Sequence, residues 1–249
     1  MSSQDATPPA RRLFMLRSIA GGAALPTVAL LGGAGAALGS TSAATAQPPA
    51  IATAPEFGYQ SFGPSEVAFV ESLVNHMCPS DDLTPNGVDC GIATYIDRQL
   101  AGGFGQGERL YTAGPWPAGK PQHGYQSPLL PDAAFKLGIA HVNEVCRTRF
   151  SHDFDGLPQA DAERVLQDVA AGRAAPYAAW LKDWFDDLVY PLFTEACFAD
   201  PIYGGNRNKV FWAAIGYPGL PATHARDIVD YRGKPYPDAA NPKSIADFS

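Results

Sequence analysis

The sequence FADPIYGGNRNKVFWAAIGYPG, residues Phe198–Gly219, joins a glycine turn, an arginine and a short apolar segment in an order that organises the rest of the chain. Two adjacent glycines, Gly204 and Gly205, can adopt positive φ and allow close backbone approach, so the loop can fix the direction of Arg207. Gly216 then ends a short amphipathic run whose apolar residues are Val210, Phe211, Ala214 and Ile215. This stretch predicts either a corner between two helices with its aromatic side chains packed inward, or a loop at the edge of a docking site.

Outward from this stretch, apolar residues recur at helical spacing and predict an all-α fold with one irregular helical domain over residues 64–219. The expected helices cover about residues 64–78, 91–100, 131–150, 158–171 and 176–199. Pro191 lies inside the last and most aromatic of them, which predicts a kink near Asp187. The residues expected to face the core are Val67, Val70, Val74, Met77, Ile92, Tyr95, Ile96, Leu100, Phe135, Ile139, Val142 and Val145.

Three segments lack a regular pattern. Residues 47–63 read as an extended arm, and the Pro-rich tail over residues 220–249 is expected to lie along a surface. Residues 102–128 hold glycine, proline and aromatic side chains, and such long loops in a domain are usually functional or covered by a partner.

The first 46 residues have the features of a signal peptide. Arg11 and Arg12 precede an uncharged stretch over residues 19–38, and residues 44–46 match an A-x-A cleavage site. The arginine pair and the mild hydrophobicity indicate twin-arginine export, which carries folded proteins. An uncleaved membrane anchor is the alternative, which the many glycines of this stretch disfavour.

The charge of the chain argues against nucleic-acid binding. Residues 1–46 carry three Arg and one Asp, so their removal leaves 203 residues and changes the net charge from −7 to −9. A protein this acidic lacks the basic surface that binds nucleic acid.

Four cysteines in an exported chain suggest disulfides. Cys78 ends the first expected helix and Cys90 precedes the second, so a hairpin-like return could bring them together. Closing so short a loop contributes roughly 2–3 kcal/mol. Cys146 and Cys197 could bridge, remain thiols or bond a partner chain.

Motifs of an independent enzyme are missing from the sequence. No C-x-x-C-H occurs for haem attachment, and the run GGFGQG over residues 102–107 lacks the βαβ context of a dinucleotide site. His141 and Glu144 lie three apart on a helix, where a hydrogen bond is the simpler interpretation than a metal site. The sequence therefore predicts no catalytic, cofactor-binding or metal-ligating residue.

Four stretches resemble the small subunit of membrane-bound, FAD-dependent sugar and sugar-acid dehydrogenases, the gluconate 2-dehydrogenase subunit 3 family. They are DRQLAG at residues 97–102, GPWP at 114–117, GYQS at 124–127 and the opening stretch at 198–219. Leu130 departs from the family pattern, where Thr or Ser is common, and the tail after Gly219 is variable.

The resemblance implies a non-catalytic subunit of an oxidoreductase complex at the outer face of the inner membrane, in the periplasm. FAD would belong to a flavoprotein partner of the glucose-methanol-choline type, and haem c to a multihaem cytochrome that reduces ubiquinone. The small subunit would bind the flavoprotein and carry it through twin-arginine export. We expect Trp116, Tyr125, Tyr203, Asn206 and Arg207 at the interface.

Two alternatives stay open. The chain could serve a related glucose, 2-ketogluconate, sorbitol or fructose dehydrogenase, because substrate specificity would reside in the partner. It could instead be a self-contained periplasmic enzyme or ligand-binding module that uses residues 102–128 and Arg207.

Overall fold

The computed structural model describes residues 58–111, 113–117, 119–120, 127–220 and 225–248. The predicted signal residues Arg11 and Arg12 and the predicted interface residue Tyr125 lie outside these ranges.

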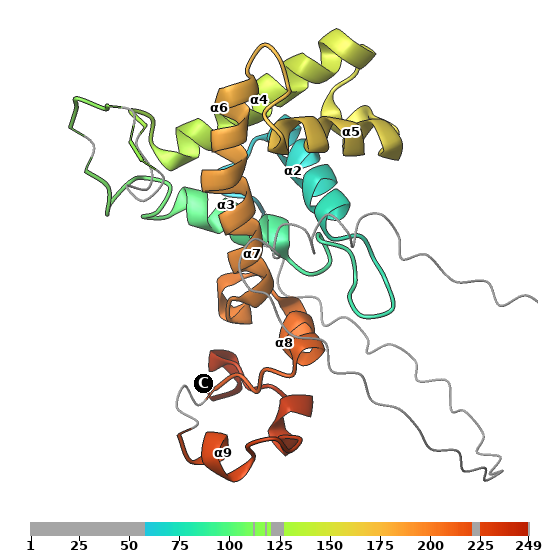
Figure 1. Ribbon diagram of the computed structural model, residues 1–249, viewed down its shortest axis with the longest axis vertical. Helices are drawn as coiled ribbons and strands as arrows, with labels where there is room; N and C mark the ends of the chain where they lie inside the picture. The colour runs from blue at the N-terminus through green and yellow to red at the C-terminus, as the bar shows by residue number, and fades with distance from the viewer. Residues whose placement is uncertain (1–57, 112, 118, 121–126, 221–224, 249) are drawn as a thin grey trace, which may run out of the picture. The chain divides into compact units, whose positions relative to one another are not determined.

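The described residues are helical and contain no strand; one isolated bridge joins Gly219 and Lys243. The all-α fold predicted from the sequence is therefore confirmed for them (Figure 1). The helices are α2 (Pro64–Met77), α3 (Ile92–Ala101), α4 (Pro131–Phe150), α5 (Gln159–Ala170), α6 (Ala178–Trp184), a π-helix η3 (Phe185–Val189), α7 (Tyr190–Phe198), α8 (Val210–Ile215) and α9 (Ala225–Asp230). Short 3₁₀ turns are η2 (Phe154–Gly156), η4 (Pro201–Tyr203), η5 (Arg207–Lys209), η6 (Pro237–Ala240) and η7 (Ile245–Phe248).

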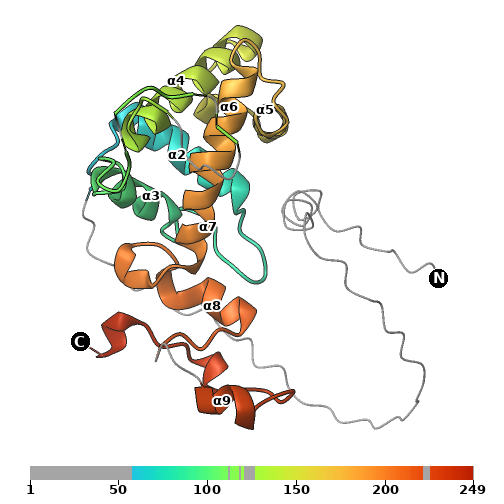
Figure 2. The ribbon, with the colours of Figure 1, turned by 60° about the vertical axis from the view of Figure 1, so that its left-hand side comes forward.

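The core lies between α2, α3, α4, α5 and the long rod formed by α6, η3 and α7. Helix α6 packs against α4 and α5, and α7 packs against α3 (Figures 1 and 2). The predicted inward positions are buried except Val67, which is partly exposed. Phe69 and Leu73 are also fully buried, so the apolar stripe of α2 is wider than the sequence pattern indicated.

The rod changes from α-helix to π-helix next to Asp187, where the sequence predicts a kink. Pro191 has no N–H to donate to the carbonyl of Asp187, and the π-helical segment Phe185–Val189 lies directly before it. Trp184, at the start of this change, lies over Gly138 of α4, where an added Cβ would be 2.1 Å from the indole Cε2. Only glycine leaves room for the indole, so Gly138 lets α4 and the rod approach closely.

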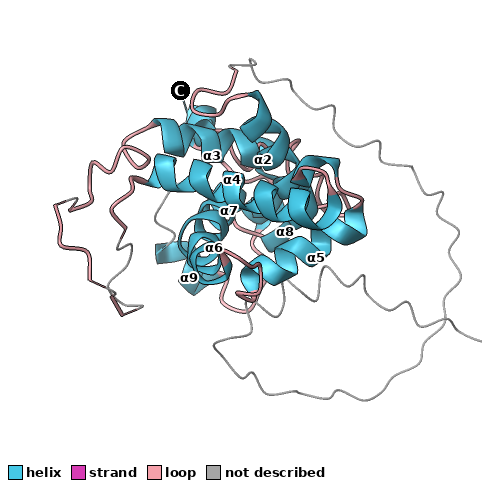
Figure 3. Cartoon of the chain, turned by 90° about the horizontal axis from the view of Figure 1, so that it is seen from above, coloured by secondary structure: helices cyan, strands magenta, loops and turns pink. Residues whose placement is uncertain are grey.

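The described part of the segment between α3 and α4 holds turns and no helix, and it extends away from the helices (Figure 3). Among the described residues no helix is long and apolar enough to cross a bilayer.

Candidate docking site

The turn after α7 is built so that only glycine fits. Asp200 begins it, because its Oδ1 accepts a hydrogen bond from the N–H of Ile202 at 3.0 Å. Gly204 has φ of 101°, and an added Cβ would be 2.7 Å from Nη1 of Arg98. A Cβ on Gly205 would be 2.4 Å from the carbonyl oxygen of Ala196. The turn therefore lies directly against α3 and α7.

Asn206 holds the corner between α7 and α8 from inside. It is fully buried, its Nδ2 donates to the carbonyl of Ala199 at 3.2 Å, and its Oδ1 accepts from the N–H of Phe211 at 3.0 Å. The sequence analysis expected Asn206 at a partner interface. The structure gives its side chain this internal role, because both backbone groups would otherwise lack a partner at a helix end.

Arg207 points towards α3. Its N–H donates to the carbonyl of Cys90 at 3.0 Å, and its Nη2 donates to Oγ1 of Thr94 at 3.0 Å. The side chain is partly buried. Its main role in this structure is to attach the turn to the first turn of α3, which leaves only part of the guanidinium for a partner.

The residues after the turn have an unusual backbone. Asn206, Asn208 and Lys209 have φ of 44°, 57° and 58°. Each such left-handed non-glycine residue costs about 1–2 kcal/mol. The surroundings hold them: the N–H of Lys209 donates to the carbonyl of Asn206 at 2.8 Å, and its Nζ pairs with Asp247 at 2.5 Å.

This strained corner presents apolar side chains to solvent. We call five of them the corner surface; they are between 41% and 61% exposed, and they are Phe198, Ile202, Tyr203, Ile215 and Tyr217. Of α8 only Trp212 is buried, and its indole Nε1 donates to the carbonyl of Phe198 at 2.8 Å. The apolar run identified in the sequence therefore does not pack inward as a whole: Trp212 is buried and Ile215 is exposed. The predicted docking role of the stretch stays a prediction.

The tail extends this surface. The N–H of Ile245 donates to Oδ2 of Asp200 at 2.9 Å, which places η7 against η4. Asp247 accepts hydrogen bonds from Lys209 and from the N–H of Ser244, and these lower the pKa of Asp247 to about 2. Ile245 and Phe248 are 40% and 67% exposed, so the tail adds apolar side chains near the corner.

The remaining predicted interface residue within the described ranges, Trp116, lies on a separate segment. It is 45% exposed on the loop between α3 and α4, where Tyr111 is 88% exposed. Tyr203 lies on the corner surface instead. The predicted residues thus come from two segments, and the corner is the one that the helices hold in place.

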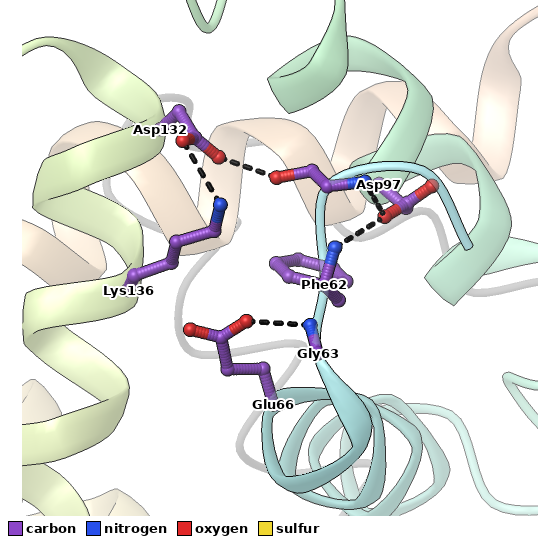
Figure 4. Close-up of polar contacts among 7 residues, drawn as sticks. Phe62, Gly63, Glu66, Asp97, Asp132 and Lys136 are labelled. Carbon is purple, nitrogen blue, oxygen red and sulfur yellow. Dashed lines mark hydrogen bonds and ion pairs between the residues drawn. The ribbon is translucent and has the colours of Figure 1, made fainter.

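Asp97 is a buried residue whose role the sequence analysis did not identify. Its carboxylate accepts three backbone N–H groups of the arm, from Gln60 at 2.7 Å and Ser61 at 2.9 Å, and from Phe62 at 3.0 Å (Figure 4). The Oγ of Ser61 also donates to Asp132 of α4. The first residue of the DRQLAG motif therefore fastens the arm to α3, and Ser61 fastens it to α4. A carboxylate on the inner face of an otherwise apolar helix was the available signal.

The two cysteines of the predicted bridge lie side by side as free thiols. The Sγ atoms of Cys78 and Cys90 both donate to the carbonyl oxygen of Pro85, at 3.8 Å and 3.5 Å. The predicted hairpin-like return is confirmed, and the covalent bond stays a prediction.

His141 and Glu144 take part in aromatic and hydrogen-bond contacts. The imidazole of His141 stacks on Tyr177 with ring centroids 3.7 Å apart, and burial lowers its pKa. Glu144 accepts the hydroxyl hydrogen bond of Tyr177 at 2.7 Å. Within the described part of the chain, no group of three His, Cys, Asp or Glu residues could hold a metal ion.

Comparison with known proteins assigns the family. The family model of gluconate 2-dehydrogenase subunit 3 matches residues 64–219. The chain belongs to the gluconate 2-dehydrogenase subunit 3 family. The match begins at the first residue of α2 and ends directly after the corner surface, so the tail lies beyond it. No curated protein and no solved structure matches the chain.

As a subunit 3 protein, the chain is expected to associate with the other subunits of a dehydrogenase complex. The corner is fastened to α3 and to the tail, and it exposes Phe, Ile and Tyr side chains within the family-matched residues.

Proposed function

We propose that the chain is the non-catalytic small subunit of a periplasmic, FAD-dependent gluconate 2-dehydrogenase complex, and that it binds the flavoprotein subunit through the corner surface. FAD and haem c reside in the partner subunits, and the cytochrome passes electrons to ubiquinone. The observation that carries the proposal is the exposed apolar surface on a strained, internally fastened turn within the family-matched region. Protein interfaces concentrate their binding free energy in such aromatic anchors.

Two groups of residues contribute to the proposed interface. Tyr203 and Ile215 provide apolar contact area, while Trp116 and the exposed part of Arg207 lie outside the corner surface and provide secondary contacts. A stable interface buries roughly 800 Å² on each partner, an area that spans many side chains. The tail residues Ile245 and Phe248 extend the apolar area next to the corner surface.

The test is co-purification of this chain with a tagged flavoprotein subunit of the gluconate dehydrogenase type. The double variant Tyr203→Ser plus Ile215→Ser is expected to lower the recovered amount at least tenfold, since losing two buried anchors costs roughly 2 kcal/mol or more. Ile228→Ser removes an equally exposed apolar side chain from α9, beyond the family match, and leaves recovery unchanged. Equal recovery of the double variant and the unchanged chain would contradict the proposal.

A further inference from the structure

Three thiols gather directly beneath the corner surface. Cys78 follows the last residue of α2, Cys90 precedes α3, and Cys197 lies in α7; all three are buried. The charge of Cys197 adds to the causes that raise the pKa of Cys90, and the charge of Cys78 adds to burial in raising the pKa of Cys197, so the three thiols lie near one another. Cys146, in α4, has Asp153 and two arginines as its electrostatic neighbours instead.

The segment between Cys78 and Cys90 is folded so that the two sulfur atoms meet. The N–H of Gly87 donates to the carbonyl of Cys78 at 2.9 Å, and the N–H of Cys90 donates to the carbonyl of Asn86 at 2.9 Å. A Cβ on Gly87 would be 2.4 Å from the carbonyl oxygen of Val74. The return is therefore packed tightly against the end of α2, which brings both thiols to the carbonyl of Pro85.

The two thiols differ in their tendency to ionise. Contact between the two thiols lowers the pKa of Cys78 and raises the pKa of Cys90. The thiolate is the nucleophile in disulfide exchange, and either cysteine of the pair can make the first attack because both give the same product. Residues 80–83 are exposed, so local opening of this short segment gives a small oxidant access.

Cys90 is also attached to the strained corner. Its carbonyl accepts the N–H of Arg207 at 3.0 Å. Its neighbour Gly91 has φ of 80°, and an added Cβ would be 2.2 Å from the carbonyl oxygen of Gly204 and 2.8 Å from Nε of Arg207. Cys90 and Gly91 thus form the surface on which residues 204–209 lie, and any constraint on Cys90 acts on that segment.

We propose that Cys78 and Cys90 are a modification site that takes a disulfide by exchange with a small disulfide oxidant, and that this bond holds residues 204–209 in their strained conformation. One of the two cysteines, for example Cys78, attacks as the thiolate one sulfur of the oxidant, whose S–S bond breaks and releases one thiolate. Cys90 loses its proton and attacks the Cys78 sulfur, which releases the second thiolate. The two protein thiols lose two electrons and two protons, and the oxidant is reduced to two thiols.

The first measurement is thiol mapping of the full chain after incubation with oxidised glutathione, followed by alkylation with N-ethylmaleimide and peptide mass spectrometry. We expect Cys78 and Cys90 in one linked peptide about 2 Da lighter than the sum of the two thiol peptides, as two hydrogens are lost. Cys146 is expected to remain unlinked. Alkylation of both Cys78 and Cys90, or a link from Cys78 to Cys197, would overturn the proposal.

The second measurement follows the corner itself. Trypsin cleaves after Arg207 and Lys209, and cleavage requires local opening of residues 204–209. Oxidation of the unchanged chain is expected to slow cleavage at these two sites at least fivefold, and dithiothreitol is expected to restore the faster rate. In Cys90→Ser the oxidised and reduced chains are expected to be cleaved at the same rate, whereas in Cys146→Ser oxidation still slows cleavage. If Cys90→Ser does not fold, the comparison of oxidised and reduced unchanged chain still decides, and equal cleavage rates would refute the coupling.

Discussion

At the residue scale, Asp97 holds the arm through three hydrogen bonds. Three backbone N–H groups of residues 60–62 converge on its carboxylate in a buried setting. Hydrogen bonds to a charged acceptor contribute more than neutral ones, and removing the acceptor leaves the donors unpaired. Asp97→Ala is therefore expected to lower the free energy of unfolding by about 3 kcal/mol, measured by urea denaturation.

Hydrogen exchange at the three arm amides tests their contact with Asp97 more directly than overall stability does. Hydrogen exchange at Gln60, Ser61 and Phe62 is expected to accelerate in Asp97→Ala. Asp82→Ala, at an exposed position on a loop, is the matched control, and its expected change is within about 0.5 kcal/mol. Unchanged exchange at residues 60–62 would show that Asp97 does not fasten the arm.

At the element scale, the contact between α4 and the rod of α6, η3 and α7 depends on Gly138. A glycine inside an exposed helix usually gains stability on substitution by alanine. Here the sign is expected to reverse: Gly138→Ala should destabilise by about 2 kcal/mol, because the new methyl group overlaps the Trp184 indole. Thermal unfolding measures the effect, and near-ultraviolet circular dichroism reports the displaced indole.

Gly156 in η2 is the matched control for this substitution. A Cβ added to Gly156 would lie 3.7 Å from Cβ of His152, which is an ordinary contact, so Gly156→Ala is expected to be nearly neutral. Equal effects of the two substitutions would mean that the α4 contact tolerates a wider spacing than the structure shows.

The attachment of the tail is a second property at the element scale, and it depends on pH. The pKa of Asp247 is lowered from its ordinary value near 4 to about 2. A carboxyl group whose pKa is lower in the folded than in the unfolded state stabilises the fold fully at pH values above the unfolded-state pKa. This stabilisation is lost as the pH falls through the folded-state pKa. The tail is therefore expected to stay attached above about pH 4 and to loosen between pH 4 and 2.

Hydrogen exchange of the Ser244 amide, which donates to Asp247, measures this attachment as a function of pH. In Asp247→Asn the exchange protection is expected to be weaker at neutral pH and to lose its dependence on pH in this window. Protection that persists unchanged at pH 2 would show that Lys209 and Asp247 do not hold the tail.

At the scale of the whole molecule, the twin-arginine export predicted from residues 1–46 would connect the first residues to the proposed partner-binding surface. The twin-arginine route carries folded cargo, so a flavoprotein bound at the corner surface would be exported on the predicted signal of this chain. Arg11→Lys plus Arg12→Lys is expected to reduce the periplasmic amount of both subunits at least tenfold, measured by fractionation and immunoblotting. Loss of this chain alone, with the flavoprotein still exported, would contradict the shared route.

Much of the helical content follows from the sequence itself. Helix α2 begins at Pro64, where proline and an acidic first turn favour a helix start, and α3 follows an apolar pattern ending at Leu100. Pro191 indicated the disturbance at Asp187, because the missing N–H is a property of the residue wherever it lies. Such local preferences are readable because they depend on a few neighbouring residues.

The candidate docking site could be predicted from the sequence only in part. The glycine turn and the arginine of the corner stand out in the sequence, yet the direction of Arg207 depends on Thr94 of α3, which lies 113 residues earlier in the chain. The direction of Asn206 depends on how α7 and α8 meet around it. Whether Trp212 or Ile215 faces the core likewise depends on which side of α8 contacts α7. The family assignment, the existence of the corner and the return that brings Cys78 to Cys90 follow from the sequence. The exposed face of the corner and the Asp97 anchor are decided by tertiary structure, because each depends on contacts between segments whose relative position no local pattern encodes.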